Sequence, residues 1–427
     1  MVYRYCEKEC FPMNGKRMYE LLEKMNYVRV GGTEEEKKTA ELLQAECASF
    51  GLEAKIEEFE IEDGELGECY FEVTEPYQKS YEMRAYKRCA SVEAEAEILY
   101  VEDALPANLR NAKDKILFIN GGLGYDKYET FLKTGAKCIV MGSGSALDRV
   151  EDTDIRFGMF RSQMTEKFEN RLSALNVRTK DLFEMLVKGA KKAKVKIESK
   201  DTTSTSRNVV AYIKGTEKPE EVIALTAHYD SVPDSPGIYD NAAGSAILME
   251  LARYFVANPP RYTLCLIWTG SEERGLLGSK AFVKDHEEEL KNIQLAVNFD
   301  LAGNIAGHEF SIVTGPEELK GYLEVQAKEK GWAVSVSQDT YSSDGLPFAD
   351  NGIPAVSIGR FGAPDMSFIH DRRDQIQFVS ADAMEITAVR ALDFVDRMDK
   401  AVMMPFERTM PDNMKTKIDE YFRRNKK

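Results

Sequence analysis

The sequence predicts an α/β fold with a mostly parallel central sheet, helices on both faces of that sheet, and a smaller inserted β-rich α/β domain. Three observations support this prediction. Beyond residue 207, apolar runs of strand length alternate with segments of helical periodicity. The runs at 222–227, 263–268 and 295–299 are almost continuously apolar, as expected for strands that are buried on both faces. Between residues 62 and 200, short β-like runs separated by glycines replace this rhythm.

Residues 1–61 begin the α/β pattern. Apolar side chains recur with helical spacing between residues 16 and 25, which predicts a first helix. Thr33 precedes three glutamates, a capping signal that predicts a second helix ending near Gly51. Residues 52–61 then alternate between apolar and polar side chains, as a half-buried strand does.

Residues 62–200 form the predicted insert. The segment contains β-like runs, helix-like stretches and glycine-rich turns, but no histidine. A segment without histidine is a poor candidate for a metal site, so we interpret it as a covering domain. The predicted division of the chain is therefore one domain from 1–61 together with 201–427, interrupted by the insert at 62–200.

The α/β alternation resumes after Arg207 and continues almost to the end of the chain. The expected strands are 209–213, 222–227, 263–268, 295–299, 310–313, 333–336 and 354–358. The expected helices are 243–258, 278–284, 316–330 and 380–398. The polar tail from Arg408 is expected to form a loose surface helix.

Composition argues against several classes of partner and favours one location. The 427 residues carry a net charge of −15, which argues against nucleic acid and against anionic membranes as partners. No apolar run approaches the ~20 residues of a membrane span, and the first ten residues lack the apolar core of a signal peptide. Seven scattered cysteines favour reduced thiols and a cytoplasmic location. Cys6 and Cys10 lack a second pair at metal-binding spacing, so we take them as ordinary cysteines.

Acidic and imidazole side chains gather just beyond the carboxyl ends of the expected strands. In chain order they are His228, Asp230, Asp240, Glu272, Glu273, Asp300 and His370. Each has a plain alternative when taken singly: a helix cap, a solvated turn or a structural histidine. Because ligands of open α/β sheets bind outside the carboxyl ends of the strands, the convergence favours a metal site with nitrogen and oxygen ligands.

The motifs around these residues resemble the di-zinc peptidases of clan MH, which include bacterial aminopeptidases, glutamate carboxypeptidases and a catalytically inactive receptor branch. The matching segments are His228-Tyr-Asp230, Asp240-Asn-Ala-Ala-Gly244, Thr269 to Ser279, Asn298-Phe-Asp300, and Gly352-Ile-Pro-Ala355 with His370. The resemblance extends to the family's N-terminal segment at residues 29–36 and 42–61 and, more weakly, to a protease-associated domain in the insert at 115–119 and 135–140.

This resemblance implies two zinc ions and a set of five metal ligands. His228 and Asp300 would bind one ion, Glu273 and His370 would bind the other, and Asp240 would bridge both. Cobalt or manganese could occupy the same nitrogen and oxygen ligands.

The resemblance also implies the roles of the neighbouring carboxylates. Glu272 would be the general base that takes a proton from the zinc-activated water. Asp230 would orient His228, and Asp374 resembles the acidic residue that follows the last histidine in the family. A cis peptide bond is expected between Asp240 and Asn241.

Two positions depart from the family pattern. Ile369 stands where relatives often carry a tyrosine that stabilises the oxyanion. Tyr341 is a candidate substitute, with an ordinary loop tyrosine as the alternative. Gly345 stands where many relatives carry a histidine.

The function implied is that of a zinc metallopeptidase, an aminopeptidase that hydrolyses the N-terminal bond of peptide substrates. Three alternatives stay open on the same fold: a carboxypeptidase or dipeptidase, a glutaminyl cyclase with one zinc, and a non-catalytic, receptor-like binding protein. Glu272 and the complete ligand set argue against the last of these. Homo-oligomerisation is left open.

Overall fold

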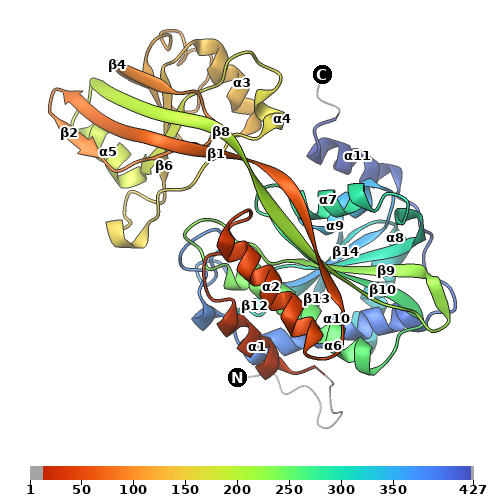
Figure 1. Cartoon of the computed structure of the whole chain (residues 1–427). Coiled ribbons are helices and arrows are strands. Elements are labelled where there is room, and N and C mark those ends of the chain that lie inside the picture. Colours follow the sequence, from red (N-terminus) through yellow and green to blue (C-terminus); the bar gives the residue numbers. More distant parts are fainter. Residues whose placement is uncertain (1–12, 425–427) are drawn as a thin grey trace. The chain divides into compact units, whose positions relative to one another are not determined.

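The computed structural model describes residues 13–424 and divides the chain into two units (Figure 1). Cys6 and Cys10 lie outside the described residues. The first unit ends at Phe59 and resumes at Thr205, and the second unit is Glu60–Ser204. Two 22-residue strands, β1 (Ala54–Glu75) and β8 (Lys192–Ile213), contribute to both units. The boundaries expected from the sequence, 61/62 and 200/201, fall inside these strands.

The sheet of the first unit has four adjacent parallel strands at its centre. The strand order is β13-β12-β14-β11-β9-β10-β8, in which β14, β11, β9 and β10 run parallel. β12 is antiparallel to β14, and the end of β8 is antiparallel to β10. The bounds are β9 Lys218–His228, β10 Tyr262–Thr269, β11 Ile293–Phe299, β12 Gly307–Thr314, β13 Val334–Gln338 and β14 Ala355–Gly362. The predicted fold class, a mostly parallel α/β sheet, is confirmed.

Both faces of this sheet are covered, which is why its strands are so apolar. All eight residues of β10 are buried. Leu264, Leu266 and Trp268 pack into one core, whereas the alternating Cys265 and Ile267 pack into a second core on the other face. This alternation follows from the period of two residues along a strand.

Helices from distant parts of the chain supply the two covering layers. Residues of α1 (Gly15–Lys24), α2 (Glu34–Ala48), α6 (Ala243–Ala257), α8 (Glu317–Lys330) and α10 (Ala381–Lys400) belong to the first core. Residues of α7 (Leu277–Asp285), α9 (Gly345–Asp350) and α11 (Asp412–Tyr421) belong to the second. α11 is the polar tail of the sequence, and it packs through Met414 and Ile418 instead of lying loose.

The second unit is a small α/β domain with its own core. Parallel strands β4, β5, β6 and β7 are flanked by β3 on one side and by the antiparallel first half of β8 on the other, and β1 pairs with β2. The bounds are β2 Lys79–Tyr81, β3 Arg84–Ala85, β4 Val92–Tyr100, β5 Ile116–Ile119, β6 Cys138–Ser143, β7 Ala174–Arg178, α3 Tyr125–Thr134, α4 Ser162–Thr165 and α5 Thr179–Val187. Fully buried residues such as Phe118 and Val140 form the centre of its core.

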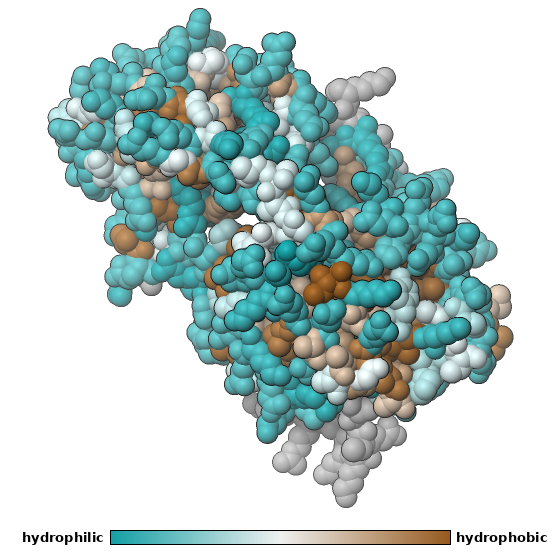
Figure 2. Space-filling model, viewed as in Figure 1, coloured by the Kyte–Doolittle hydropathy of each residue, from teal (hydrophilic) through white to brown (hydrophobic). Residues whose placement is uncertain are grey.

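Hydrophilic residues dominate the molecular face drawn in Figure 2, with apolar residues scattered among them. Within residues 13–424, no helix combines the length and the apolar character that a membrane crossing requires.

Candidate metal centre

Three neighbouring parallel strands end side by side and deliver most of the candidate ligands. His228 is the last residue of β9, and it is paired in register with Thr269 at the end of β10. Glu272 and Glu273 lie just beyond β10, and Asp300 follows β11 directly. Because parallel strands expose their carboxyl ends at one edge, these side chains converge there.

The remaining two candidates come from loops around the same edge. Asp240 lies in a short turn, Ile238–Ala242, that leads into α6, and His370 follows β14. The backbone of His370 has a φ of 53°, an unusual conformation for a residue other than glycine. All five predicted metal ligands are thus brought together.

These residues form two groups that share one carboxylate. The first group is His228, Asp240 and Asp300, and the second is Asp240, Glu273 and His370. Oδ1 of Asp240 lies 3.2 Å from Nε2 of His228, and its Oδ2 lies 3.3 Å from Nε2 of His370. Asp300 Oδ1 lies 3.5 Å from the first histidine nitrogen, and Glu273 Oε2 lies 2.9 Å from the second. The two oxygens of Asp240 therefore face opposite groups, which is the arrangement of a bridging carboxylate.

The electrostatics of both groups suit bound cations. Hydrogen bonds with Asp240 and Glu273 raise the pKa of His370 to about 11. Burial, reinforced by the charge of Asp240, raises the pKa of Glu273 to about 7. Among the described residues, buried Glu273 Oε1 and Asp300 Oδ1 have no hydrogen-bond partner. Buried carboxylates need a compensating positive charge, and two divalent ions would supply it through ordinary nitrogen and oxygen ligands.

Glu272 lies beside the clusters but belongs to neither of the two groups. Its Oε2 is 4.0 Å from Nε2 of His228. Burial raises the pKa of Glu272 well above its ordinary range, although the charge of His228 opposes this effect. A carboxyl group close to the clusters but outside the ligand groups suits proton transfer.

Asp230 faces His228 but makes its hydrogen bonds elsewhere. Its Oδ1 lies 3.5 Å from Nδ1 of His228. That nitrogen atom has no hydrogen-bond partner among the described residues. The same carboxylate accepts the backbone N–H groups of Glu272 at 3.0 Å and Glu273 at 3.3 Å. Asp230 therefore joins the end of β9 to the turn after β10, a role that the sequence did not indicate.

Asp374 holds the backbone of the central carboxylate. It is buried and accepts the N–H groups of Tyr239 at 2.7 Å and Asp240 at 3.0 Å. The Asp240–Asn241 peptide bond is cis, as expected from the resemblance. The side chain of Asn241 then donates to the carbonyl of Phe299 at 2.7 Å, which links this turn to β11.

Tyr341 lies in the loop between β13 and α9. Its ring packs against Phe310 and Phe361, with centroid separations of 5.6 Å and 6.4 Å. Burial, followed by the charges of Asp300 and Asp240, raises its pKa well above the usual range. The phenol therefore stays protonated under the influence of these carboxylates. Ile369, at the position where relatives often carry a tyrosine, is 44% exposed.

Asp344 is a buried carboxylate that the sequence analysis did not single out. It accepts a hydrogen bond from Thr269 Oγ1 at 2.5 Å, at the end of β10, and its Oδ1 has no partner among the described residues. Burial raises its pKa to about 6. Its position just before α9 gives it the appearance of a helix cap in the sequence, which hides this contact.

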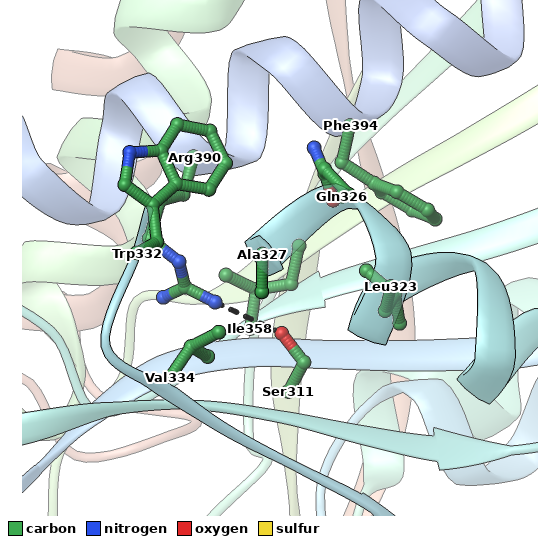
Figure 3. A pocket seen from close by; sticks show the side chains of 9 residues that line it. All are labelled: Ser311, Leu323, Gln326, Ala327, Trp332, Val334, Ile358, Arg390 and Phe394. Carbon is green, nitrogen blue, oxygen red and sulfur yellow. Dashed lines mark hydrogen bonds between the residues drawn. The ribbon is translucent and has the colours of Figure 1, made fainter. Parts of the chain in front are cut away.

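A small pocket elsewhere in the first unit is unrelated to the clusters (Figure 3). Arg390 and Trp332 line it, and Arg390 donates to Ser311 Oγ at 3.0 Å. None of the candidate ligands lines this pocket.

The chain is similar in sequence to known metallopeptidases. The sequence model described as Peptidase family M28 matches residues 208–395. Aminopeptidase YwaD of Bacillus subtilis is 27% identical over 96% of this chain and 90% of its own length. A probable zinc metalloprotease of Leptosphaeria maculans is 38% identical over 36% of each chain.

Solved structures share the fold. BSAP, a zinc aminopeptidase from Bacillus subtilis, superposes with a TM-score of 0.78 at 22% identity and covers 95% of this chain and 100% of its own. The aminopeptidase from Aneurinibacillus sp. strain AM-1 gives a TM-score of 0.71 at 24% identity, over 90% of this chain and 94% of its own. The predicted resemblance to clan MH is confirmed: residues 208–395 match Peptidase family M28, and the chain is similar over most of its length to a named aminopeptidase.

Proposed function

We propose that this peptidase is an aminopeptidase that removes N-terminal residues from peptides with two zinc ions bound at the shared clusters. The observation that carries the proposal is the position of Asp240, whose two oxygens face separate histidine and carboxylate groups. In the proposed site, His228 and Asp300 would hold one ion, Glu273 and His370 would hold the other, and Asp240 would be shared by both.

Two bound zinc ions would lower the pKa of a shared water and polarise the scissile carbonyl. Glu272 then takes the proton of the attacking water and passes it to the leaving amine. Asp230 holds the backbone of Glu272 in place through the hydrogen bond at 3.0 Å. Tyr341, which stays protonated, is in the right region to donate to the developing oxyanion.

The names and coverage of the relatives favour an aminopeptidase over the alternatives. YwaD and BSAP are both named aminopeptidases, and each aligns with more than nine-tenths of this chain. A non-catalytic binding protein would have no need of the buried Glu272 beside two ligand groups. The cytoplasmic location and any homo-oligomer stay predictions.

Hydrolysis of an amino acid p-nitroanilide, measured with and without a free α-amine, tests the substrate class. We expect release from the free-amine substrate and none from its N-acetylated form. A chelator should abolish activity and added zinc should restore it. Equal cleavage of the acetylated substrate would reject the aminopeptidase, and cyclisation of N-terminal glutamine would favour the cyclase alternative.

Glu272→Gln tests the base separately from metal binding. The variant should retain two zinc ions per chain, measured by elemental analysis, and lose about 100-fold or more in kcat, the contribution typical of general bases. Glu35→Gln, on the exposed side of α2, is the matched control and should behave as the unmodified protein. Unchanged turnover in Glu272→Gln would refute the assignment, and a single bound zinc in the unmodified protein would refute the two-ion site.

A further inference from the structure

Arg29 is a fully buried cation in the segment between α1 and α2, outside the stretch 208–395 that the family model covers. The side chain is 0% exposed, and arginine keeps its charge in any protein environment. A charge buried so completely is costly unless its donors are paired. Its partners therefore show what the residue does.

The guanidinium group of Arg29 donates to five backbone carbonyls. Two belong to its own segment, Met25 at 2.6 Å and Tyr27 at 2.8 Å. The other three bracket a single loop: Tyr229 at 2.8 Å, Pro236 at 2.5 Å and Gly237 at 2.9 Å. This loop, 229–237, begins immediately after His228 and ends three residues before Asp240.

The backbone of Arg29 strengthens the same contact. Its N–H donates to Ser231 Oγ at 2.9 Å, and its carbonyl accepts the N–H of Ser231 at 3.1 Å. Arg29 thus makes seven of these hydrogen bonds, and five of them hold the loop between the two candidate ligands.

Two residues later, the same segment contacts the turn that carries the other half of the site. A Cβ atom on Gly31 would lie 2.0 Å from Ser271 Oγ and 2.9 Å from its Cα, so only glycine fits there. The carbonyl of Gly31 accepts a hydrogen bond from Arg274 at 3.0 Å. Ser271 and Arg274 flank Glu272 and Glu273 on either side.

We propose that Arg29 is a positioning residue that, together with Gly31, sets the spacing between the His228–Asp240 loop and the Glu272–Glu273 turn. This inference rests on the proposed zinc-binding function. A shared metal site tolerates only small errors in the placement of its ligands, about 0.5 Å. The planar fork of arginine can satisfy five fixed carbonyls at once, whereas the flexible ammonium group of lysine offers only three donors.

A purely structural role makes a different prediction. Loss of the buried hydrogen bonds would then lower stability and leave the zinc affinity of the folded protein unchanged. Positioning requires that the zinc affinity falls as well. The distinction therefore needs a variant that loses stability in the same region without touching either loop.

Arg17→Met provides this control. Arg17 lies on α1 in the same N-terminal region and pairs with buried Glu250 through its Nε at 2.8 Å. None of its hydrogen bonds reaches residues 229–237 or 271–274.

The experiment measures zinc dissociation constants by competition with a chromophoric chelator, for the unmodified protein, Arg29→Lys, Arg29→Met, Gly31→Ala and Arg17→Met. Circular dichroism establishes the folded fraction of each variant. We expect about 10-fold or greater loss of zinc affinity for the Arg29 and Gly31 variants, the effect typical of residues that orient ligands. Arg17→Met should keep the affinity of the unmodified protein even where its melting temperature falls.

Hydrogen exchange of the unmodified protein provides a test that does not depend on the folding of any variant. Because coupling between sites is reciprocal, zinc should slow exchange in residues 29–33 as well as in 229–237. The proposal would be overturned if the folded Arg29→Lys and Gly31→Ala variants bound zinc as tightly as the unmodified protein. It would also be overturned if the hydrogen-exchange rates of residues 29–33 were the same with and without zinc. Failure of the unmodified protein to bind zinc would instead reject the proposed function.

Discussion

Glu36 should make the stability of the first unit depend on pH in a direction opposite to that of most carboxylates. Its side chain is completely buried, at 0% exposure. It accepts hydrogen bonds from Ser206 Oγ, from Gly32 N–H at 3.0 Å and from Arg207 N–H at 3.4 Å. Burial outweighs these bonds and raises its pKa from 4.5 to about 7. Glu36→Gln removes this titration while keeping a similar shape.

The magnitude follows from linkage between protonation and folding. Because the folded pKa lies above the unfolded value, the contribution of Glu36 is fully present below about pH 4.5 and is lost as the pH rises through about 7. A shift from 4.5 to about 7 corresponds to about 3 kcal/mol in total, of which about 2.5 kcal/mol falls between pH 5 and pH 8. The unmodified protein should therefore lose about 2.5 kcal/mol more than Glu36→Gln over that interval.

Urea unfolding of the zinc-free protein at pH 5, 6, 7 and 8 measures this difference. Both tryptophans, Trp268 and Trp332, belong to the first unit, so their fluorescence reports on that unit alone. Glu35→Gln, one residue away on the exposed side of α2, should run parallel to the unmodified protein. Parallel curves for Glu36→Gln and the unmodified protein would show that Glu36 is ionised in the folded state, which would refute the reasoning.

Three further predictions concern other contacts. Tyr341→Phe should lower kcat by about 10-fold or more with two zinc ions still bound, and unchanged kcat would exclude the phenol from catalysis. Lys417→Ala removes the pair between α11 and Asp339 at 2.8 Å, next to the Tyr341 loop, and should lower kcat several-fold, whereas Lys415→Ala should not. Burial lowers the pKa of His286, but Glu57 at 3.1 Å and Glu289 at 3.4 Å together outweigh burial and raise it. His286→Gln should therefore cost stability below about pH 6.5 and approach the unmodified protein as the pH rises through the raised value, and a melting deficit that is constant with pH would contradict this.

The parallel core of the fold was predictable because burial on both faces leaves a direct mark on the sequence. β10 is buried at every position and is apolar from Leu264 to Trp268, since alternate residues enter different cores. The long strand β1 left a weaker mark. The sequence indicates two separate strands on either side of residue 62, with Gly64 and Gly67 between them, but the structure joins them into one. A Cβ on Gly67 would lie 2.5 Å from the Glu198 carboxylate, so this glycine allows a close approach within a strand rather than a turn.

The candidate ligands were predictable for a similar reason. His228 is the last residue of β9 and Asp300 directly follows β11, and parallel strands bring such residues to one edge. Arg29 carries no such signal, because its partners are backbone carbonyls that any sequence supplies. Asp344 is hidden for another reason, since an aspartate before a helix is an ordinary cap. The sequence therefore does not indicate which residues position the ligands through hydrogen bonds to the backbone.

The two long strands have a consequence for how this chain can be dismantled. β1 and β8 are paired, and Arg207 Nε on β8 donates to Glu58 on β1 at 3.1 Å, close to where the first unit ends and resumes. The ends created by removing Glu60–Ser204 would therefore already lie on neighbouring strands. A short hairpin turn could reconnect them at little cost in loop-closure entropy. The insert is in this sense removable, and the first unit, joined by such a turn, is a minimal protein that can be made and assayed alone.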